Sequence, residues 1–501
     1  MSFDIKWTEY GPISDRLQSA SLAELCVEEV GVQTGPFGSQ LHRKDYVESG
    51  TPIITVEHLG DNRIAHINTP FVSDEDKNRL SKYHLQKGDI VFSRVGSVDR
   101  RALVRAAEDG WLFSGRCLRV RADNEKINPI YLSYFFGLES FKNYIRSIAV
   151  GATMPSLNTK LLSGVSIYYP ESLEEQKLIA GQLYTIDEKI ELNRQMNQTL
   201  EQIAQAIFKS WFVDFEPTRA KIIAKEQGAD LATQELAAQA IICGVITLEQ
   251  LEEIEQNLET TLQQAINEKL TRDNETPINA EQLKATAALF PNELVESELG
   301  EIPTDWEVKA LSEMVELIGG GTPKRSEPAY WGGSICWFSV KDAPSDGNVF
   351  VIDTDEKITE AGLNGSSTKL LPLGTTIITA RGTVGRLALT GVITAMNQSC
   401  YGIRGIEGTG PYLNYLQIHR AVETLQQNTH GAVFDTITRT TFETVFQAQA
   451  NVEIRECFEK LVAPIFEKIK SNLQQISVLS ELRDTLLPKL LSGELSLAEN
   501  E

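Results

Sequence analysis

Two groups of basic side chains are the residues with the clearest chemical potential in this sequence. Leu80 to Arg121 contains nine basic and four acidic residues, and Ala361 to Ile406 contains four basic residues and no acidic one. The guanidinium group of arginine binds phosphate oxygens and forms bidentate hydrogen bonds with the edge of guanine. Each group therefore predicts a surface that binds a nucleic acid.

The individual candidates follow from these groups and from the turns beside them. They are Arg94, Arg100, Arg101, Arg116, Arg119 and Arg121 in the first group, Arg381 and Arg386 in the second group, and Lys324 and Arg325 upstream of the second group. Ser97 and Thr383 follow glycines in similar turns, which either offer N–H and hydroxyl groups to phosphate or are simply tight turns. Asn397 and Gln398 carry amides that can pair with adenine. A single arginine is more often a solvated surface residue than a DNA contact, so the prediction depends on the clusters and not on individual residues.

No set of residues predicts a metal site or a catalytic centre. The six cysteines lie far apart and form no C-x-x-C pair, and the six histidines form no H-E-x-x-H or H-x-H pattern. We expect the cysteines to be reduced and mostly buried.

Two short strings have the appearance of cofactor motifs. Asn128-Pro-Ile-Tyr131 is similar to the N-P-P-Y string of amino-methyltransferases, but Ile130 replaces the second proline and no strand with a glycine-rich turn precedes it. We expect it to begin a helix whose aromatic residues, Tyr131, Tyr134 and Phe135, pack in the core. Gly319 to Thr322 lacks the spacing of a phosphate-binding loop, so a flexible turn is expected there.

The charge balance at first argues against a nucleic acid, because the net charge is -22. Glu216 to Gly300 holds 16 acidic and 6 basic residues, so this stretch alone accounts for -10 of the total. Its Ala- and Gln-rich composition predicts that the stretch forms helices. A solvated connector is the expected structure, and a partner-docking surface is the alternative.

The segments around the basic groups repeat along the chain. Ile186–Asn193 and Ile465–Asn472 share the pattern I-x-E-K-I-x-x-N at an offset of 279. Apolar residues continue this pattern every 3.5 positions, and an asparagine interrupts both copies at the same place, which predicts two coiled-coil helices. The predicted seam contains Ile186, Ile190, Asn193, Asn197, Leu200 and Ile207 in the first helix, and Ile465, Ile469, Asn472, Ile476, Leu479 and Leu486 in the second.

Local signals mark the ends of these helices. Ser172-Leu-Glu-Glu175 has the form of a capping box, which predicts that the first helix begins there. Gly493 is typical of a position just after a helix. Pro464 and Pro488 lie inside the second heptad pattern, and they favour a start near Pro464 and a kink or an end near Pro488.

The similarity extends upstream of both helices. Three further pairs match, namely Gly96–Leu103 with Gly382–Leu389, Gly88 with Gly374, and more weakly Gly151–Ser156 with Gly431–Thr436. Both copies mix short β-branched runs with short helical patterns, which predicts two similar α+β domains of roughly 150 residues each. Between the matched segments the two copies differ widely.

The predicted fold is therefore α+β, with two similar domains related by pseudo-twofold symmetry and separated by two long antiparallel coiled-coil helices. If the helices are matched end to end, paired positions sum to about 669, so Asn197 lies opposite Asn472. The predicted segments are an N-terminal segment 1–20, a first domain 21–171, a first helix 172–215, an acidic helical linker 216–300, a second domain 301–450, a second helix 451–493 and a tail 494–501.

Hydropathy predicts no membrane segment, because no run of about 18 uncharged apolar residues occurs. The first ten residues lack the basic and apolar regions of a secretory signal. We therefore expect a cytoplasmic protein.

Several longer strings resemble one family, the specificity (S) subunit of type I restriction-modification systems. They are Ala206–Pro217, Ser297–Trp306, Gly319–Pro323 with Tyr330–Gly333, Pro155–Asn158 before Leu173–Lys177, and Arg483–Leu495. The strings cover nearly the whole chain, and the long acidic stretch after Pro217 departs from the family pattern.

The resemblance implies a non-catalytic chain with two target-recognition domains. It implies binding of a bipartite, asymmetric double-stranded DNA site, one half per domain. Two adenine-methylating M subunits would bind the spacer helices, and R subunits, the translocase and endonuclease, would join for ATP-dependent cleavage. S-adenosylmethionine and ATP with Mg would be bound by those partners, and no cofactor by this chain.

Two other classes of protein remain open at this point. A structural adaptor would hold two protein partners on the coiled coil without reading bases. A DNA methyltransferase with its own recognition domain would need a cofactor-binding fold, for which the chain has no unassigned space. The acidic balance also predicts that the chain alone binds DNA weakly and depends on M subunits for affinity.

Overall fold

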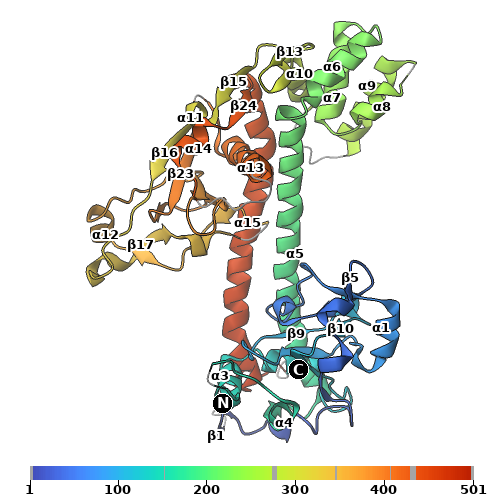
Figure 1. Ribbon diagram of the computed structural model, residues 1–501, viewed down its shortest axis with the longest axis vertical. Helices are drawn as coiled ribbons and strands as arrows, with labels where there is room; N and C mark the ends of the chain where they lie inside the picture. Colours follow the sequence, from blue (N-terminus) through green and yellow to red (C-terminus); the bar gives the residue numbers. More distant parts are fainter. Residues whose placement is uncertain are drawn as a thin grey trace. The chain divides into compact units, whose positions relative to one another are not determined.

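The computed structural model describes residues 4–151, 153–254, 256–272, 279–344, 347–406, 408–428 and 436–497. The chain divides into two compact units, Met1–Ile190 with Ser477–Glu501 (unit 1) and Glu191–Ile476 (unit 2). Each unit contains one α+β domain and one part of each of two long helices, α5 (Leu173–Phe212) and α15 (Val452–Leu491) (Figure 1).

The domain of unit 1 is built on two four-stranded sheets. The first has the order β4 (Val32–Thr34), β11 (Cys117–Val120), β8 (Ile90–Ser93) and β9 (Arg101–Leu103), with all neighbours antiparallel. The second has the order β10 (Leu112–Phe113), β6 (Thr51–Ile54), β7 (Phe71–Val72) and β5 (Tyr46–Val47), with β10 parallel to β6. Two strand pairs complete the domain, β1 (Ile5–Thr8) with β2 (Gly11–Ser14), and β3 (Gln18–Ser21) with β12 (Ser166–Tyr169).

The domain also contains four short helices, namely α1 (Asp74–Arg79), α2 (Pro129–Phe135), α3 (Glu139–Ile148) and α4 (Thr159–Ser163). Helix α2 begins where Asn128 accepts hydrogen bonds from two backbone N–H groups, and Pro129 occupies its first turn. Tyr131, Tyr134 and Phe135 are buried in the core. The Asn128–Tyr131 string is therefore a helix start, as the sequence predicted.

The domain of unit 2 repeats this plan with a larger sheet. Its five strands have the order β16 (Val315–Gly319), β23 (Cys400–Gly405), β20 (Thr376–Thr379), β21 (Leu387–Thr390) and β18 (Phe350–Val351). A second sheet has the order β19 (Lys357–Ile358), β17 (Trp331–Phe338) and β22 (Thr394–Met396), with β22 parallel to β17. The strand pairs are β13 (Leu294–Ser297) with β14 (Gly300–Pro303) and β15 (Glu307–Ala310) with β24 (Phe446–Gln449), and the helices are α11 (Leu311–Met314), α12 (Glu360–Asn364), α13 (Pro411–Asn428) and α14 (Arg439–Glu443).

The predicted internal repeat is present at the level of single backbone contacts. Gly88 and Gly374 both have positive φ, at 97° and 76°, and a Cβ at either position would meet the proline that begins the next helix, Pro129 or Pro411. Ser93 N donates to Arg100 O over 2.9 Å in unit 1, and Thr379 N donates to Arg386 O over 2.9 Å in unit 2. The match of Gly151–Ser156 with Gly431–Thr436 lies largely outside the described residues.

The two long helices are antiparallel in each unit. In unit 2, Asn472 Nδ2 donates to Asn197 Oδ1 over 2.8 Å, and Asn193 Nδ2 donates to Gln475 Oε1 over 3.3 Å. In unit 1, Arg483 Nη1 donates to Asp187 Oδ1 over 3.0 Å. The register expected from the heptad pattern, with Asn197 opposite Asn472, is confirmed, and so is the expected fold class of two similar α+β domains with two long antiparallel helices.

The residues of the predicted seam are buried or half-buried along both helices. In unit 2 the two asparagines satisfy part of each other's hydrogen-bonding capacity within an apolar seam. An asparagine at such a position disfavours other registers at a cost in stability, because a shifted helix would leave the amide buried without a partner.

The expected start of the second helix near Pro464 was wrong. Helix α15 begins at Val452, well before Pro464, and continues past Pro488 to Leu491. Each proline removes only one backbone donor, and the seam on both sides of Pro464 is buried, so packing outweighs the loss. Gly493 follows the helix with φ of 73°, as expected. At the other helix, Glu175 N donates to Ser172 Oγ over 3.4 Å where α5 begins.

The acidic stretch after α5 forms a helical subdomain, residues 216–288, and is not a solvated connector. Its helices are α6 (Glu216–Glu226), α7 (Leu231–Ile242), α8 (Leu248–Glu252), α9 (Leu258–Arg272) and α10 (Ala280–Ala288). They share a core of buried side chains that includes Ala220, Ala237, Leu251, Leu262 and Leu283. Small alanines let α6 and α7 pack closely, so modest apolar content suffices for a core. The expectation of a connector was therefore wrong.

Within the described ranges, no helix is long and apolar enough to cross a membrane.

Candidate nucleic-acid interface

Three loops of the unit 1 domain lie together and form what we term loop face 1, residues 35–38, 94–100 and 114–116. Arg94 N donates to Arg116 O over 2.8 Å, and Arg94 Nη1 donates to Gly115 O over 3.0 Å. A Cβ on Gly115 would lie 2.8 Å from Phe37 Cβ, so the third loop packs directly on the first. In the second loop, Gly96 N donates to Pro155 O over 2.9 Å.

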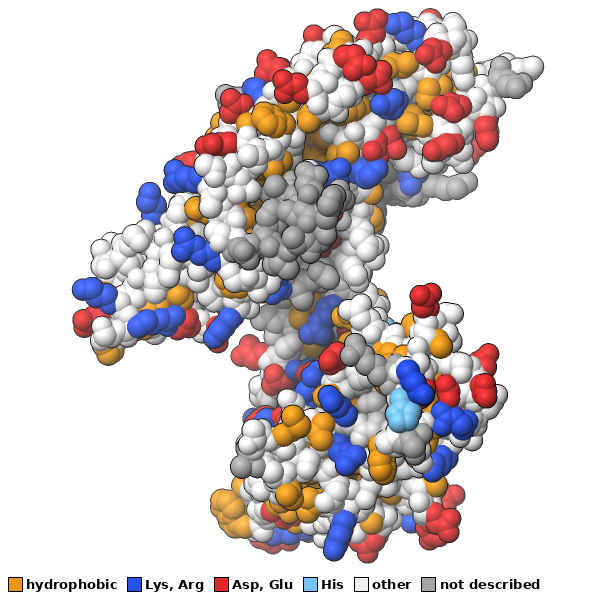
Figure 2. Space-filling view, in the orientation of Figure 1, with side chains coloured by type: hydrophobic (Ala, Val, Ile, Leu, Met, Phe, Trp, Pro, Cys, Tyr) orange, Lys and Arg blue, Asp and Glu red, His pale blue; other side chains and the backbone are white. Residues whose placement is uncertain are grey.

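Loop face 1 carries basic side chains that are accessible to a ligand. Arg116 and Ser97 are exposed, and Arg94 is half-buried. Within the described part of the chain, no carboxylate forms an ion pair with Arg94 or Arg116. Figure 2 shows Lys and Arg side chains spread over both α+β domains, whereas acidic side chains are frequent on the helical subdomain. These side chains can bind phosphate or guanine as the sequence predicted.

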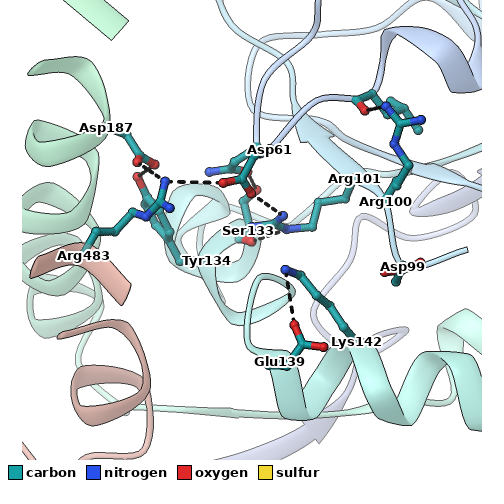
Figure 3. Close-up of polar contacts among 12 residues, drawn as sticks. Asp61, Asp99, Arg100, Arg101, Ser133, Tyr134, Glu139, Lys142, Asp187 and Arg483 are labelled. Atoms are coloured by element: carbon teal, nitrogen blue, oxygen red, sulfur yellow. Dashed lines mark hydrogen bonds and ion pairs between the residues drawn. The ribbon is translucent and has the colours of Figure 1, made fainter. Parts of the chain in front are cut away.

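Two of the predicted arginines have a structural role instead. Arg101 is 5% exposed; its Nε donates to Ser133 O over 3.0 Å, and its Nη1 lies 3.6 Å from Asp61 Oδ1 (Figure 3). Arg119 is 1% exposed, and its Nη2 donates to Val30 O over 2.7 Å. Burial lowers the pKa of both groups, that of Arg119 to about 10. Neither side chain is accessible to a duplex, so their prediction as DNA contacts is corrected.

Two more arginines of the first group are engaged within the domain. Arg121 forms a bidentate ion pair with buried Asp89, with Nε–Oδ1 and Nη2–Oδ2 distances of 2.8 and 2.7 Å. Its prediction as a DNA contact is corrected for a different reason, because contact with DNA would leave a buried carboxylate without its partner. Arg100 is half-buried and donates to Leu59 O, pointing away from Arg101 in Figure 3.

The equivalent loops of unit 2 form loop face 2, residues 320–325, 380–386 and 397–399. Ala380 N donates to Ser399 O over 2.7 Å, which matches the bond from Arg94 N to Arg116 O in unit 1. A Cβ on Gly320 would clash with Asn397 O, just as a Cβ on Gly35 would clash with Ser114 O. The glycine run at Gly319–Thr322 is therefore a site of close backbone packing, and the expectation of a flexible turn was wrong.

Loop face 2 presents a different set of side chains. Lys324, Arg381 and Thr383 are exposed, and Gln398 is exposed and hydrogen-bonded to Thr322 Oγ1. Asn397 is half-buried and accepts from Ser399 N over 2.9 Å, which leaves its amide donors for other partners.

The remaining two candidates of unit 2 form hydrogen bonds within the domain. Arg325 forms a bidentate ion pair with Glu356 and lies over the Trp331 ring at 4.0 Å from its centroid. The hydrogen bonds from Arg325 lower the pKa of Glu356. Arg386 is half-buried and donates to Pro344 O over 2.7 Å.

Two aromatic residues of these faces were not predicted from the sequence. Phe37 is 62% exposed on loop face 1, and the Arg94 guanidinium lies 5.9 Å from its ring centroid. Trp331 holds Arg325 at the border of loop face 2. A usable signal was present for Phe37, because an aromatic residue between Pro36 and Gly38 lies in a turn where core packing does not require it.

Within the described residues, no group of three or more His, Cys, Asp or Glu side chains is arranged to hold a metal ion. The repeated domains and their basic loop faces thus define a two-domain protein of the nucleic-acid-binding class.

Comparison with known proteins identifies this class. The family model for the type I restriction modification DNA specificity domain matches residues 29–202 and 303–454. The chain therefore belongs to the family of type I restriction-modification specificity subunits, and its two α+β domains are the DNA specificity domains of that family. The prediction made from the sequence motifs is confirmed.

Individual relatives support the assignment over nearly the full length. The type I restriction enzyme HindI specificity subunit of Haemophilus influenzae is 30% identical, with 89% of this chain and 95% of the relative covered. The MjaIX specificity subunit of Methanocaldococcus jannaschii is 23% identical, with 94% and 93% covered. The crystal structure of the S subunit from M. genitalium has the same fold, with a TM-score of 0.51 at 12% identity and coverage of 98% and 99%.

Proposed function

We propose that this specificity subunit reads a bipartite, asymmetric DNA sequence, with one half-site read by each α+β domain. The observation that supports this most directly is the pair of loop faces. The two faces share a backbone hydrogen bond and a close glycine approach, but their side chains differ at equivalent positions, with Phe37 and Gly115 on one and Thr322 and Gln398 on the other. Two different sets of side chains on one scaffold suit two different half-sites.

The long helices support a second part of the proposal, the binding of methyltransferase partners. Both helices expose large apolar side chains away from their shared seam, namely Leu178, Val478 and Leu482 in unit 1 and Leu192 and Ile203 in unit 2. We assign these faces to two M subunits, with R subunits joining the complex. S-adenosylmethionine and ATP with Mg are then bound by the partners, and this chain takes part in recognition without catalysis.

The net charge of -22 supports dependence on those partners for affinity. Attraction to phosphates is the main sequence-independent contribution to DNA binding, and an acidic chain provides little of it outside its local basic faces. The subunit alone is expected to bind DNA weakly, and M subunits are expected to supply much of the electrostatic attraction.

Purification of the complete chain with its M subunits, followed by footprinting, tests this function. We expect co-purification of methyltransferase, a footprint with two protected segments, and much weaker binding by the subunit alone in a gel-shift assay. Partner binding without any sequence-dependent footprint would favour the adaptor. Methylation of DNA by the isolated chain would favour the self-contained methyltransferase. Tight, salt-sensitive binding by the subunit alone would contradict the dependence on M subunits.

A further inference from the structure

Phe37 is exposed on loop face 1 among side chains that can bind DNA. A single exposed apolar residue is normal on a protein surface and needs no explanation by itself. Phe37 differs in its surroundings, because Arg94 lies beside its ring and Arg116 belongs to the loop that packs beneath it. The ring thus lies beside one arginine, and a second arginine belongs to the neighbouring loop.

The backbone around Phe37 is arranged so that this ring can occupy its position. Gly115 lies directly under the residue, and a Cβ there would stand 2.5 Å from Pro36 O and 2.8 Å from Phe37 Cβ. A side chain at residue 115 would therefore displace the loop that carries Phe37. The third loop also positions the Arg94 guanidinium, since Gly115 O accepts a hydrogen bond from Arg94 Nη1.

The equivalent place in unit 2 has the opposite chemistry. The matching hydrogen bonds from Arg94 N to Arg116 O and from Ala380 N to Ser399 O align Gly115 with Gln398. The matching close approaches of Gly35 and Gly320 align Phe37 with Thr322. Thr322 and Gln398 are hydrogen-bonded to each other, so an amide and a hydroxyl stand where unit 1 has a ring over a glycine.

We propose that Phe37 is a specificity-determining residue that makes an apolar contact with a base of the half-site read by unit 1. This inference rests on the proposed function. An aromatic ring can contact a thymine methyl group or enter a base step, neither of which an amide does well. Arg94 and Arg116 hold the neighbouring phosphates or guanine. At the same place in unit 2, Gln398 offers the donor and acceptor that pair with adenine.

A binding selection on the complete complex tests the proposal. The chain is purified with its M subunits and used to select from a library of DNA duplexes of fully random sequence. The wild-type complex should select a bipartite motif. Phe37→Ala should reduce the preference at one or two adjacent positions of one half-site by about tenfold, which is the usual scale for one base contact. The other half-site and the thermal unfolding temperature should not change.

Three further variants sharpen the result. Phe37→Leu keeps an apolar side chain and should keep most of the preference. Trp7→Ala removes an aromatic side chain that is 81% exposed on hairpin β1–β2, outside loop face 1, and should leave the motif intact. Gln398→Ala should relax the other half-site only.

The outcomes separate this inference from the function on which it rests. An unchanged motif with Phe37→Ala overturns the role of Phe37, and so does an equal loss of affinity for all sequences. If Phe37→Ala and Gln398→Ala relax the same half-site, the assignment of one half-site to each domain is wrong. If the wild-type complex selects no motif, the proposed function itself fails.

Discussion

At one pair of equivalent positions, the long helices and the α+β domain meet through polar contacts in unit 1 and through aromatic contacts in unit 2. The offset of 279 pairs Asp187 with Phe466 and Arg483 with Ala204. In unit 1, Arg483 Nη1 lies 3.0 Å from Asp187 Oδ1, and Tyr134 Oη donates to Asp187 Oδ2 over 2.6 Å (Figure 3). In unit 2, Phe466 is fully buried and stacks on Tyr412 at a centroid distance of 4.5 Å.

The surroundings of these two contacts also differ, since they are charged in unit 1 and aromatic in unit 2. In unit 1 the ion pair borders a cavity of about 530 Å³ that is also lined by Asp61, Arg101 and Glu139. In unit 2 the Phe466 ring also meets Tyr415, edge to face, at 5.9 Å. The repeat therefore keeps its glycine turns and its helix register, while the chemistry between domain and helix differs at these positions. The scaffold depends on backbone geometry that several sets of side chains can support.

Among substitutions at these contacts, we expect the largest loss of stability in unit 2. Phe466→Ala removes a fully buried ring and leaves a cavity, so we expect a loss of about 3–5 kcal/mol in the free energy of unfolding of that unit. Denaturant unfolding combined with hydrogen exchange, which reports each unit separately, measures it. Phe466→Leu should lose clearly less. A loss below about 1 kcal/mol with Phe466→Ala would mean that the aromatic cluster does not hold the domain to its helix.

Arg483→Ala is expected to have the next largest effect, in unit 1. It removes an ion-pair partner of the mostly buried Asp187 carboxylate, which keeps its hydrogen bond from Tyr134, so we expect a loss of about 3 kcal/mol. The double variant Asp187→Phe with Arg483→Ala copies the unit 2 pair. It should recover much of the loss, because apolar side chains often replace a buried ion pair without cost. If the double variant is less stable than Arg483→Ala alone, the two junctions are not interchangeable.

The part of the fold that could be predicted from the sequence is the part defined by local or periodic patterns. The seam asparagines gave the correct register because a polar residue in an apolar stripe needs one particular partner. Asn128 and Gly493 marked the ends of helices through contacts within a few residues. The helical subdomain was misjudged because its charge suggested solvation, whereas its core depends on alanines from helices distant in sequence.

The candidate site was predictable as a region but not residue by residue. Arg119 contacts Val30, and Arg101 contacts Asp61 and Ser133, all far away in the sequence. A count of arginines contains no information on such contacts, so buried and exposed guanidinium groups looked alike. Phe37 was missed because a cluster of basic residues carries no signal for an aromatic residue in a neighbouring turn.

A comparison of Arg116 with Arg119 separates DNA contact from structure. Arg116 is exposed on loop face 1, so Arg116→Ala should leave stability within about 0.5 kcal/mol. The slope of log affinity against log salt should fall by about one if Arg116 contacts a phosphate. Arg119→Ala removes a buried guanidinium and its hydrogen bonds to Val30 O, Lys82 O and His84 O, and we expect a loss of about 2 kcal/mol in stability. Gel shifts of the complex at several salt concentrations and thermal unfolding measure both effects. The interpretation fails if the two variants behave alike.

The smallest expected effect concerns the equivalent helix starts at Pro129 and Pro411. In unit 1, Asn128 accepts from backbone N–H groups of α2, and in unit 2 the Glu459 carboxylate accepts from Tyr412 N and Leu413 N at 3.1 and 2.9 Å. Burial raises the pKa of Glu459, although these hydrogen bonds oppose the shift. Between the ordinary and the raised pKa, the folded state binds more protons than the unfolded state. The stability of unit 2 should therefore fall as the pH rises through that window.

Glu459→Gln should flatten this dependence on pH in unit 2, because the neutral amide does not titrate. Asn128→Asp should create a dependence of the opposite sign in unit 1, because the N-terminus of a helix favours the charged carboxylate and lowers its pKa. Stability would then rise with pH through the carboxylate range. Hydrogen exchange of α13 from about pH 4 to pH 7 and of α2 from about pH 2 to pH 5 measures the two slopes, since the raised pKa lies above the ordinary carboxylate pKa of about 4 and the lowered pKa lies below it. Equal slopes in the wild type and in Glu459→Gln would show that another group of unit 2 carries the titration.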